Sequence, residues 1–418
     1  MSKIVIEGGK PLDGSLKIQG AKNAALPLMA ASLLLRGGEK LILRNVPKLK
    51  DVDTMINILK SLGFSPSRNG ETLEILSPDE IRGEVPYALM RKMRASVLIL
   101  GPLLAREGRV VLPMPGGCPI GTRPIDLHLK GLSLMGAEIT ISHGYIETRA
   151  DKLKGAKIYL DFPSVGATEN LLMAATLAKG TTIIENAARE PEISNLMELL
   201  KKMGTDVEKD GESTIVVRGT DELKGTEISV IPDRIVAGTY IIAGIISKGR
   251  IKVERVVPHH LEALLAKLEE AGVEVKQGED WIEVCFREKL SGVKVTTLPY
   301  PGFPTDLQAQ MMALLSVAKG TSIITETIFD NRFMHVAELR RMGANIKVEG
   351  RSAIINGVET LSGAQVMATD LRAGAALVLA GLSAQGMTVV SNADHIDRGY
   401  EDFVGNLSNL GGSLRRED

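Results

Sequence analysis

The feature that most constrains the fold of this chain is a pattern that recurs six times, at intervals of roughly 70 residues. Each repeat opens with an apolar, helix-length run that ends on glycine. A β-like segment, an amphipathic helix that also ends on glycine, and a further strand follow. The apolar runs span residues 28–37, 97–108, 171–180, 239–249, 311–320 and 375–386. Amphipathic helices are predicted over residues 55–63, 127–136, 196–204, 261–272, 336–343 and 403–411. Strands are predicted over residues 4–7, 16–19, 181–186, 206–209, 321–326 and 345–348.

The apolar runs determine how these elements pack. Residues 170–178, which read Asn-Leu-Leu-Met-Ala-Ala-Thr-Leu-Ala, are apolar on nearly every side, and a helix without a polar face must be covered all round. We therefore predict an α/β fold of two domains, an inside-out barrel in which buried helices are surrounded by sheets, with three repeats in each domain. The alternative is a generic layered α/β protein whose repeat spacing is coincidental.

The chain length of 418 residues also favours two domains. A boundary is expected near residues 223–231, where Gly225 and Pro232 punctuate the chain. We place the first domain at residues 22–229, including a Pro/Gly-rich loop at 114–124, and the second at residues 1–21 plus 230–418. Two similar globules that meet at a hinge form a cleft, and the active site is expected in that interdomain cleft.

Charge and composition exclude several classes of function. The chain has 50 basic and 51 acidic residues and only 3% aromatic residues, so neither a broad basic face nor a base-stacking platform for nucleic acid is expected. Neither a signal-peptide pattern nor an apolar run long enough to span a membrane is present. The two cysteines, Cys118 and Cys285, are too few for a disulfide framework. A cytoplasmic protein is expected.

The familiar phosphate and metal signatures are absent from the sequence. It has neither the glycine-rich P-loop with its lysine nor the dinucleotide-binding Gly-x-Gly-x-x-Gly after a strand. It also lacks His-Glu-x-x-His and Cys-x-x-Cys, and His259 and His260 are interpreted as a surface pair at the start of a helix. We expect neither a bound metal ion nor a cofactor.

One loop carries the pattern of a reactive site. Residues 113–128 read Pro-Met-Pro-Gly-Gly-Cys-Pro-Ile-Gly-Thr-Arg-Pro-Ile-Asp-Leu-His. Cys118 lies among glycines and prolines, which favour an exposed loop, and Arg123 is a cation that would favour the reactive thiolate. The alternative for Cys118 is a small apolar residue that happens to fall in a loop. For Cys285, in the alternating segment 281–286, that alternative is the preferred interpretation.

The loop Gly-Gly-Cys-Pro-Ile-Gly-Thr-Arg-Pro-Ile-Asp-Leu-His resembles the catalytic loop of the UDP-N-acetylglucosamine enolpyruvyl transferases, and the likeness extends over essentially the whole chain. It includes residues 20–25, 91–96, 164–168, 185–192, 304–310, 331–335, 369–374 and 395–400. The resemblance implies a fold of two domains, each of three repeated units with inward helices, which agrees with the repeat found above. It also implies transfer of the enolpyruvyl group of phosphoenolpyruvate to UDP-N-acetylglucosamine, the first committed step of peptidoglycan precursor synthesis.

The resemblance further implies roles for individual residues. Four residues match positions that hold phosphoenolpyruvate: Lys22, Asn23, Arg123 and Arg398. This substrate carries close to three negative charges, which must be compensated on burial. Cys118 matches the general acid and nucleophile, the target of the covalent inhibitor fosfomycin. Asp306 matches the candidate base for the sugar hydroxyl. The alternative for Asp306 is a helix N-cap, and the two roles can coexist.

The nucleotide-sugar site implied by the resemblance contains thirteen residues: Asn23, Arg94, Arg123, Pro124, Ile125, Asp126, Leu127, His128, Ser164, Val165, Gly166, Asp306 and Ile328. Residues 164–166 precede an apolar helix, whose first amides can receive a diphosphate. Phe162 departs from the family pattern, since some relatives carry lysine there, and this weakens any ionic contact at that position. Arg332, Asp370 and Arg372 are supporting residues, of which the last two are expected to form an ion pair, either orienting the reacting region or purely structural.

Two other functions remain open at this point. The sister transferase that acts on shikimate 3-phosphate has the same fold but lacks the thiol loop. A catalytically silent paralogue that only binds nucleotide sugar is the alternative outside enzymes, although each catalytic-type position is intact here.

Overall fold

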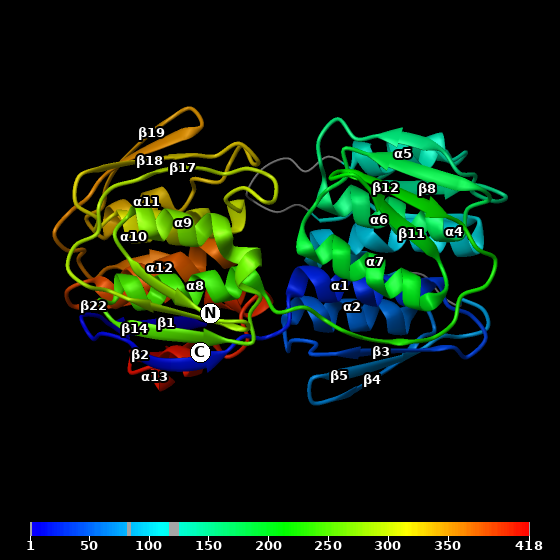
Figure 1. The fold of residues 1–418 in the computed structure, drawn as a ribbon. Helices are drawn as coiled ribbons and strands as arrows, with labels where there is room; N and C mark the ends of the chain where they lie inside the picture. Colours follow the sequence, from blue (N-terminus) through cyan, green and yellow to red (C-terminus); the bar gives the residue numbers. More distant parts are fainter. Residues whose placement is uncertain (1, 82–84, 117–124, 418) are drawn as a thin grey trace. The chain divides into compact units, whose positions relative to one another are not determined.

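The computed structural model describes residues 2–81, 85–116 and 125–417 (Figure 1). These residues form two compact units. The first unit contains residues 20–81, 85–116 and 125–231, and the second contains residues 2–19 and 232–417. None of the helices in the described ranges is long and apolar enough to cross a membrane.

The repeated pattern corresponds to one structural module, seen most completely in the third repeat. Strand β9 (Lys157–Tyr159) leads into the buried helix α6 (Val165–Thr176), which returns the chain to β10 (Thr181–Glu185), parallel to β9. The amphipathic helix α7 (Pro191–Met203) follows, and then a hairpin of β11 (Asp206–Asp210) and β12 (Thr214–Arg218) completes a sheet of order β11-β12-β10-β9. Gly204 ends α7 at a φ of 112°, a left-handed conformation that glycine adopts without a steric penalty.

The first unit contains two further repeats, one with a four-stranded sheet and one whose sheet has three strands in the described residues. Its remaining strands are β3 (Lys40–Arg44), β4 (Ser65–Asn69), β5 (Thr72–Leu76), β6 (Arg109–Pro113), β7 (Glu138–Ser142), β8 (Tyr145–Arg149) and β13 (Glu227–Ser229). They form sheets of order β13-β3-β5-β4 and β6-β8-β7. Its remaining helices are α1 (Lys22–Ala31), α2 (Lys50–Ser61), α3 (Tyr87–Lys92), α4 (Leu100–Glu107) and α5 (Asp126–Leu134), with 3-10 turns at Ser32–Leu34 and Arg94–Ile99.

The second unit repeats the module three times. Its strands are β1 (Lys3–Glu7), β2 (Asp13–Lys17), β14 (Arg250–Glu254), β15 (Glu274–Gln277), β16 (Trp281–Cys285), β17 (Lys294–Thr296), β18 (Thr321–Thr325), β19 (Asn345–Glu349), β20 (Ser352–Asn356), β21 (Gln365–Met367), β22 (Met387–Ser391) and β23 (Ser413–Glu417). Its sheets have the orders β15-β16-β14-β2, β17-β18-β20-β19 and β21-β22-β1-β23. Its helices are α8 (Arg234–Ile246), α9 (Glu262–Glu270), α10 (Gln308–Leu315), α11 (Val336–Arg341), α12 (Leu371–Ser383) and α13 (Phe403–Asn409), with 3-10 turns at Pro258–Leu261, Thr305–Leu307 and Ala393–Arg398.

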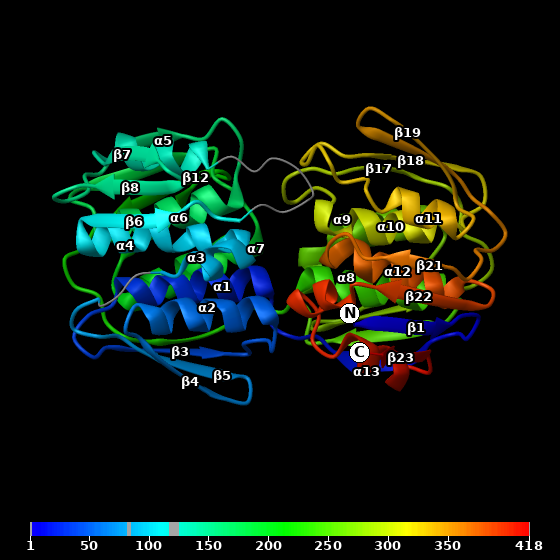
Figure 2. The same ribbon diagram turned by 180° about the vertical axis from the view of Figure 1, so that it is seen from behind.

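The apolar helices form the core of each unit, as predicted. In the second unit α8, α10 and α12 pack on one another, and all eight residues of α10 are buried. Figures 1 and 2 show strands on both sides of these helices. In the first unit α1, α4 and α6 have the same buried character. The prediction of buried helices surrounded by sheets is therefore confirmed.

Two of the buried helices, α8 and α12, begin earlier than the apolar runs indicate. α12 starts at Leu371, because the Asp370 carboxylate accepts hydrogen bonds from the Arg372 and Ala373 amides and so caps the helix. α8 starts at Arg234 with Asp233 as its cap in the same way. The apolar runs place these starts at residues 375 and 239, which leaves out first turns that each contain one arginine, Arg372 and Arg234.

The two N-terminal strands both belong to the second unit. β2 pairs in parallel with β14, and the chain then enters the first unit through α1. β1 lies between β22 and β23 and pairs antiparallel with both. In the sixth repeat β1 thus occupies the sheet position that β20 occupies in the fifth. The last module is completed by the first strand of the chain.

The core of the first unit contains a buried carboxyl group on α6. Glu169 is 3% exposed, and its Oε1 lacks a hydrogen-bond partner in the described part of the chain. Burial raises the pKa of Glu169 well above its usual value, and the neighbouring Glu192 and Glu190 raise it further. The folded protein therefore holds Glu169 in its protonated form at pH values where the unfolded chain has released the proton.

We expect Glu169→Gln to stabilise the protein at pH 8, because glutamine stays neutral in this buried position without taking up a proton. Because the folded pKa is raised, folding takes up a proton above the unfolded pKa of about 4.3, and stability is lost as the pH rises from there. Glutamine removes this cost, so the gain should vanish at pH 4. Urea unfolding at both pH values measures it, with Glu198→Gln, an exposed position on α7, as control. An equal gain at the two pH values would contradict proton uptake.

Candidate functional site

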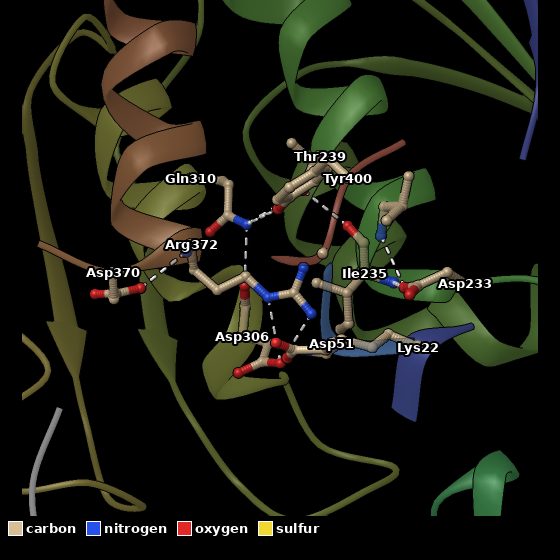
Figure 3. A network of polar contacts seen from close by, with 12 residues as sticks. Lys22, Asp51, Asp233, Ile235, Thr239, Asp306, Gln310, Asp370, Arg372 and Tyr400 are labelled. Carbon is tan, nitrogen blue, oxygen red and sulfur yellow. Dashed lines mark hydrogen bonds and ion pairs between the residues drawn. The ribbon is translucent and has the colours of Figure 1, made fainter. Parts of the chain in front are cut away.

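The Asp306 carboxylate of the second unit is held by two arginines, Arg332 and Arg372; Figure 3 shows its contact with Arg372. Arg332 donates from Nη2 to Oδ1 at 3.0 Å, and Arg372 donates from Nη2 to Oδ2 at 3.1 Å. Both arginine side chains are 3% exposed, whereas the Asp306 side chain is 26% exposed. The carboxylate is therefore accessible from one side while buried cations fix its position.

Local sequence explains how Asp306 is presented. It lies in the 3-10 turn Thr305–Leu307, immediately before α10. The alternative interpretation of Asp306 as a helix N-cap is wrong, since neither this turn nor α10 has a side-chain cap, and their N-cap residues are Pro304 and Leu307. The Asp306 carboxylate instead points toward Arg332 and Arg372, which lie later in the chain.

Three further residues support this site, and sequence reasoning missed them. Gln310, one turn after Asp306 on α10, donates from Nε2 to the Asp306 backbone oxygen at 3.0 Å. The same nitrogen lies 3.2 Å from both Thr239 Oγ1 and Tyr400 Oη. The Arg372 guanidinium also lies over the Tyr400 ring, 5.4 Å from its centroid. The sequence gives one indication of the Gln310 contact: Gln310 follows Asp306 by four residues, which is about one turn of a helix.

The expected ion pair between Asp370 and Arg372 is wrong. Figure 3 shows the Arg372 side chain directed toward Asp306, while Asp370 contacts only its backbone amide, at 2.8 Å. The reason is geometric, because Asp370 is the cap of α12 and Arg372 lies in the first turn that it caps. Burial lowers the pKa of Arg372, but Tyr400, Asp306 and Asp233 raise it by more, so the guanidinium stays charged.

In the first unit, Lys22 is the first residue of α1 and is 8% exposed. Its Nζ lies 3.4 Å from Oδ2 of Asp51, a residue of α2 that is itself buried. Sequence reasoning identified Lys22 and its neighbour Asn23 but missed Asp51. The Asp51 carboxylate therefore fixes the position of the Lys22 ammonium group at the start of α1.

The start of α6 provides a second candidate binding region in the first unit. Ser164 caps the helix by accepting from the Ala167 amide at 3.3 Å, and Val165 and Gly166 form its first turn. His128, on α5, lies against this turn, since a Cβ built on Gly166 would be 3.6 Å from His128 Nε2. Burial, with a smaller contribution from Arg94, lowers the pKa of His128 to about 4. The imidazole is therefore neutral at physiological pH.

The remaining predicted residues divide between the two units. Arg94, Ile125, Asp126 and Leu127 belong to the first unit; Ile328 and Arg398 belong to the second. The Ile328 amide donates to Oε1 of Glu326 at 2.8 Å. Cys118, Arg123 and Pro124 lie outside the described residues.

The described ranges contain no group of three or more His, Cys, Asp or Glu side chains that could hold a metal ion.

Comparison with known proteins gives matches over the whole chain. A family model described as EPSP synthase (3-phosphoshikimate 1-carboxyvinyltransferase) matches residues 6–407. UDP-N-acetylglucosamine 1-carboxyvinyltransferase 1 of Caldanaerobacter subterraneus subsp. tengcongensis is 53% identical over 416 residues, which cover 100% of both chains. UDP-N-acetylglucosamine 1-carboxyvinyltransferase 2 of Carboxydothermus hydrogenoformans is 54% identical over 418 residues, covering 100% of this chain and 99% of that protein.

Solved structures share the architecture. The enolpyruvyl transferase NikO from Streptomyces tendae aligns with a TM-score of 0.91 at 25% identity, covering 99% of this chain and 98% of that one. An EPSP synthase from Acinetobacter baumannii aligns over 100% of both chains with a TM-score of 0.77 and 18% identity. These similarities confirm the predicted two-domain barrel architecture of six repeats.

Proposed function

This chain belongs to the enolpyruvyl transferase family, and we propose that it transfers the enolpyruvyl group of phosphoenolpyruvate to the 3′-hydroxyl of UDP-N-acetylglucosamine, with release of phosphate. The observation that carries this proposal is identity above one half, over the full length, to two relatives named for that activity. We place the reaction in the cytoplasm, as the first committed step of peptidoglycan precursor synthesis.

In this proposal Asp306 is the base for the sugar hydroxyl. The two buried guanidinium groups hold it in one orientation, and its 26% exposure leaves it open to a substrate. An alcohol is far less acidic than a carboxylic acid, so the hydroxyl proton must leave as the C–O bond forms.

The enolpyruvyl group is assigned to a set of cations and one thiol. Lys22, Arg123 and Arg398 compensate the charge of phosphoenolpyruvate, and Asn23 contributes a neutral contact. The sugar oxygen bonds to C2 of phosphoenolpyruvate while Cys118 donates a proton to C3, which gives a tetrahedral intermediate. Loss of a C3 proton then reforms the double bond as phosphate leaves. The buried pairing of Lys22 with Asp51 supports a fixed position of this ammonium group.

The nucleotide sugar is assigned to the first unit and to Ile328. The amides at the start of α6, residues 164–166, can donate to the diphosphate, and Arg94, Arg123 and residues 124–128 complete the site. Phe162, which replaces a lysine of some relatives, is 42% exposed and can offer only an apolar surface. The diphosphate contact then depends on backbone amides, Arg94 and His128 rather than on a lysine.

Phosphate release in the presence of phosphoenolpyruvate and each of two acceptors tests the proposal. We expect release with UDP-N-acetylglucosamine and none with shikimate 3-phosphate. Turnover with shikimate 3-phosphate alone would assign the chain to the sister transferase. Tight binding of UDP-N-acetylglucosamine without turnover would indicate a catalytically silent paralogue.

Alkylation by fosfomycin provides an independent prediction about Cys118. Thiolate attack on the epoxide forms a C–S bond and opens the ring, and the freed oxygen takes a proton, so the protein should gain the whole mass of the inhibitor. We expect one such adduct at saturating UDP-N-acetylglucosamine, mapped to Cys118 by peptide mass analysis. Cys285, half-buried in β16, serves as the internal control. An unmodified Cys118 under these conditions would refute the assignment.

A further inference from the structure

A single buried amide, that of Asn170 on α6, connects three helical segments of the first unit. Its Oδ1 accepts from the Gly101 amide at 2.5 Å, and its Nδ2 donates to the Val97 carbonyl at 3.0 Å. Nδ2 also lies 2.9 Å from Nδ1 of His128. The backbone partners fix which end of the amide is which, because an N–H group must face the oxygen and a carbonyl must face the NH2 group.

The close approach at Gly101 makes this orientation permanent. A Cβ on residue 101 would lie 2.2 Å from Asn170 Oδ1 and 2.3 Å from the Asn170 backbone oxygen. Only glycine lets the backbone N–H come within hydrogen-bonding distance here. Asn170 is fully buried, so exchange of its amide ends would leave two backbone groups without partners.

The orientation of the amide determines the tautomer of His128. Since Nδ2 of Asn170 is a donor, Nδ1 of His128 must accept, and the ring proton of the neutral imidazole is on Nε2. His128 is 6% exposed. Within the described ranges its Nε2 has no hydrogen-bond partner, and this edge of the ring lies beside Gly166 in the first turn of α6.

We propose that Asn170 is a positioning residue that holds His128 as the neutral Nε2–H tautomer, so that this N–H donates to a diphosphate oxygen of UDP-N-acetylglucosamine at the start of α6. The inference rests on the proposed function for the identity of the ligand. The role of Asn170 depends on its hydrogen bonds with the Gly101 amide and the Val97 carbonyl, and on its contact with Nδ1 of His128. The lowered pKa of His128 supports it, since a neutral ring keeps one donor and one acceptor across the working pH range.

Imidazole nitrogen chemical shifts in the ligand-free protein test the tautomer directly. A two-bond proton–nitrogen correlation spectrum distinguishes a protonated from an unprotonated ring nitrogen, and the chain has six histidines. The His128→Gln variant identifies the His128 signals by their loss. We expect Nδ1 to be unprotonated and the Nε2–H resonance to move on addition of UDP-N-acetylglucosamine. A protonated Nδ1, or an Nε2–H that does not respond to this ligand, would overturn the inference.

Asn170→Asp reverses the polarity of the contact without changing the size of the side chain. A carboxylate next to Nδ1 favours a proton on that nitrogen, so His128 should become protonated at Nδ1. We expect KM for UDP-N-acetylglucosamine to rise about tenfold, the effect of losing one hydrogen bond to a charged group, with kcat changed by less than about twofold.

Two substitutions of His128 test the N–H donor itself. In His128→Gln, whose amide can restore an N–H donor, KM should lie closer to that of the wild type than in His128→Leu.

Asn195→Asp on α7 is the matched control. Like Asn170, Asn195 makes one hydrogen bond to a backbone carbonyl and one to a backbone amide. It donates to the Ser229 carbonyl and accepts from the Ile231 amide, both at 3.2 Å. It contacts no histidine among the described residues. An equal rise in KM in both variants would mean that the effect is structural and would reject the positioning role. Absence of turnover in the wild type, with the Nε2–H still responding to the ligand, would reject the proposed function and leave this inference standing.

Discussion

Replacing Asp306 with asparagine is expected to lower kcat for enolpyruvyl transfer by about 10²–10⁴-fold, the contribution of general base catalysis. Asparagine has nearly the same shape and keeps one acceptor oxygen, but it cannot take the hydroxyl proton. The two arginines remain in place, so substrate binding should change much less than kcat. Steady-state rates with both substrates saturating measure the effect.

The free energy of unfolding of two Asp306 variants separates a catalytic role of this residue from a structural one. Asp306→Ala leaves Arg332 and Arg372 as buried cations without their shared carboxylate, which should cost about 3–5 kcal/mol. The asparagine variant should lose less than the alanine variant, and its activity loss should far exceed its stability loss. Asp330→Asn is the control, since that carboxylate pairs with Arg351 at the surface. Wild-type kcat in Asp306→Asn would remove Asp306 from the mechanism.

Replacing Cys118 with serine is expected to reduce turnover by on the order of 10²–10⁴-fold, because a serine hydroxyl is too weak an acid to protonate C3 at neutral pH. Cys118→Asp should retain measurable turnover, since a carboxylic acid can also donate a proton. Phosphate release with UDP-N-acetylglucosamine and phosphoenolpyruvate gives both rates. Cys285→Ser, in β16, should behave like the wild type. Equal, wild-type-like rates in the serine and aspartate variants would show that residue 118 does not transfer the proton.

The fold was predictable because its strongest constraint is repeated. Residues 171–180 and their five counterparts are too apolar for a surface helix, and each lies at the same place in a module. The helix starts were less predictable. Asp233 and Asp370 cap their helices through backbone amides two and three residues ahead. Each aspartate is followed by a first turn that contains an arginine, and the capping carboxylates could have identified those starts.

The site was predictable only in part, because family resemblance identifies residues but not their contacts. Asp306 and Arg372 were both identified, yet their pairing joins positions 66 residues apart. The expected Asp370 pair followed from closeness in sequence, which the capping geometry overrides. Asp51, Gln310 and Asn170 were missed because each acts through a neighbour, and a polar residue within an apolar helix does not reveal in sequence which backbone group it will meet.

The position of β1 has a consequence for how the polypeptide acquires its structure during synthesis. Ser2 Oγ accepts a hydrogen bond from Arg416 at 2.7 Å, across 414 residues, and β1 pairs only with β22 and β23 in the described sheet. Residues 20–231 can therefore complete their unit while the ribosome is still translating the other half. β1 is synthesised before residues 20–231, yet it meets its partner strands only after residues 387–417 have been made.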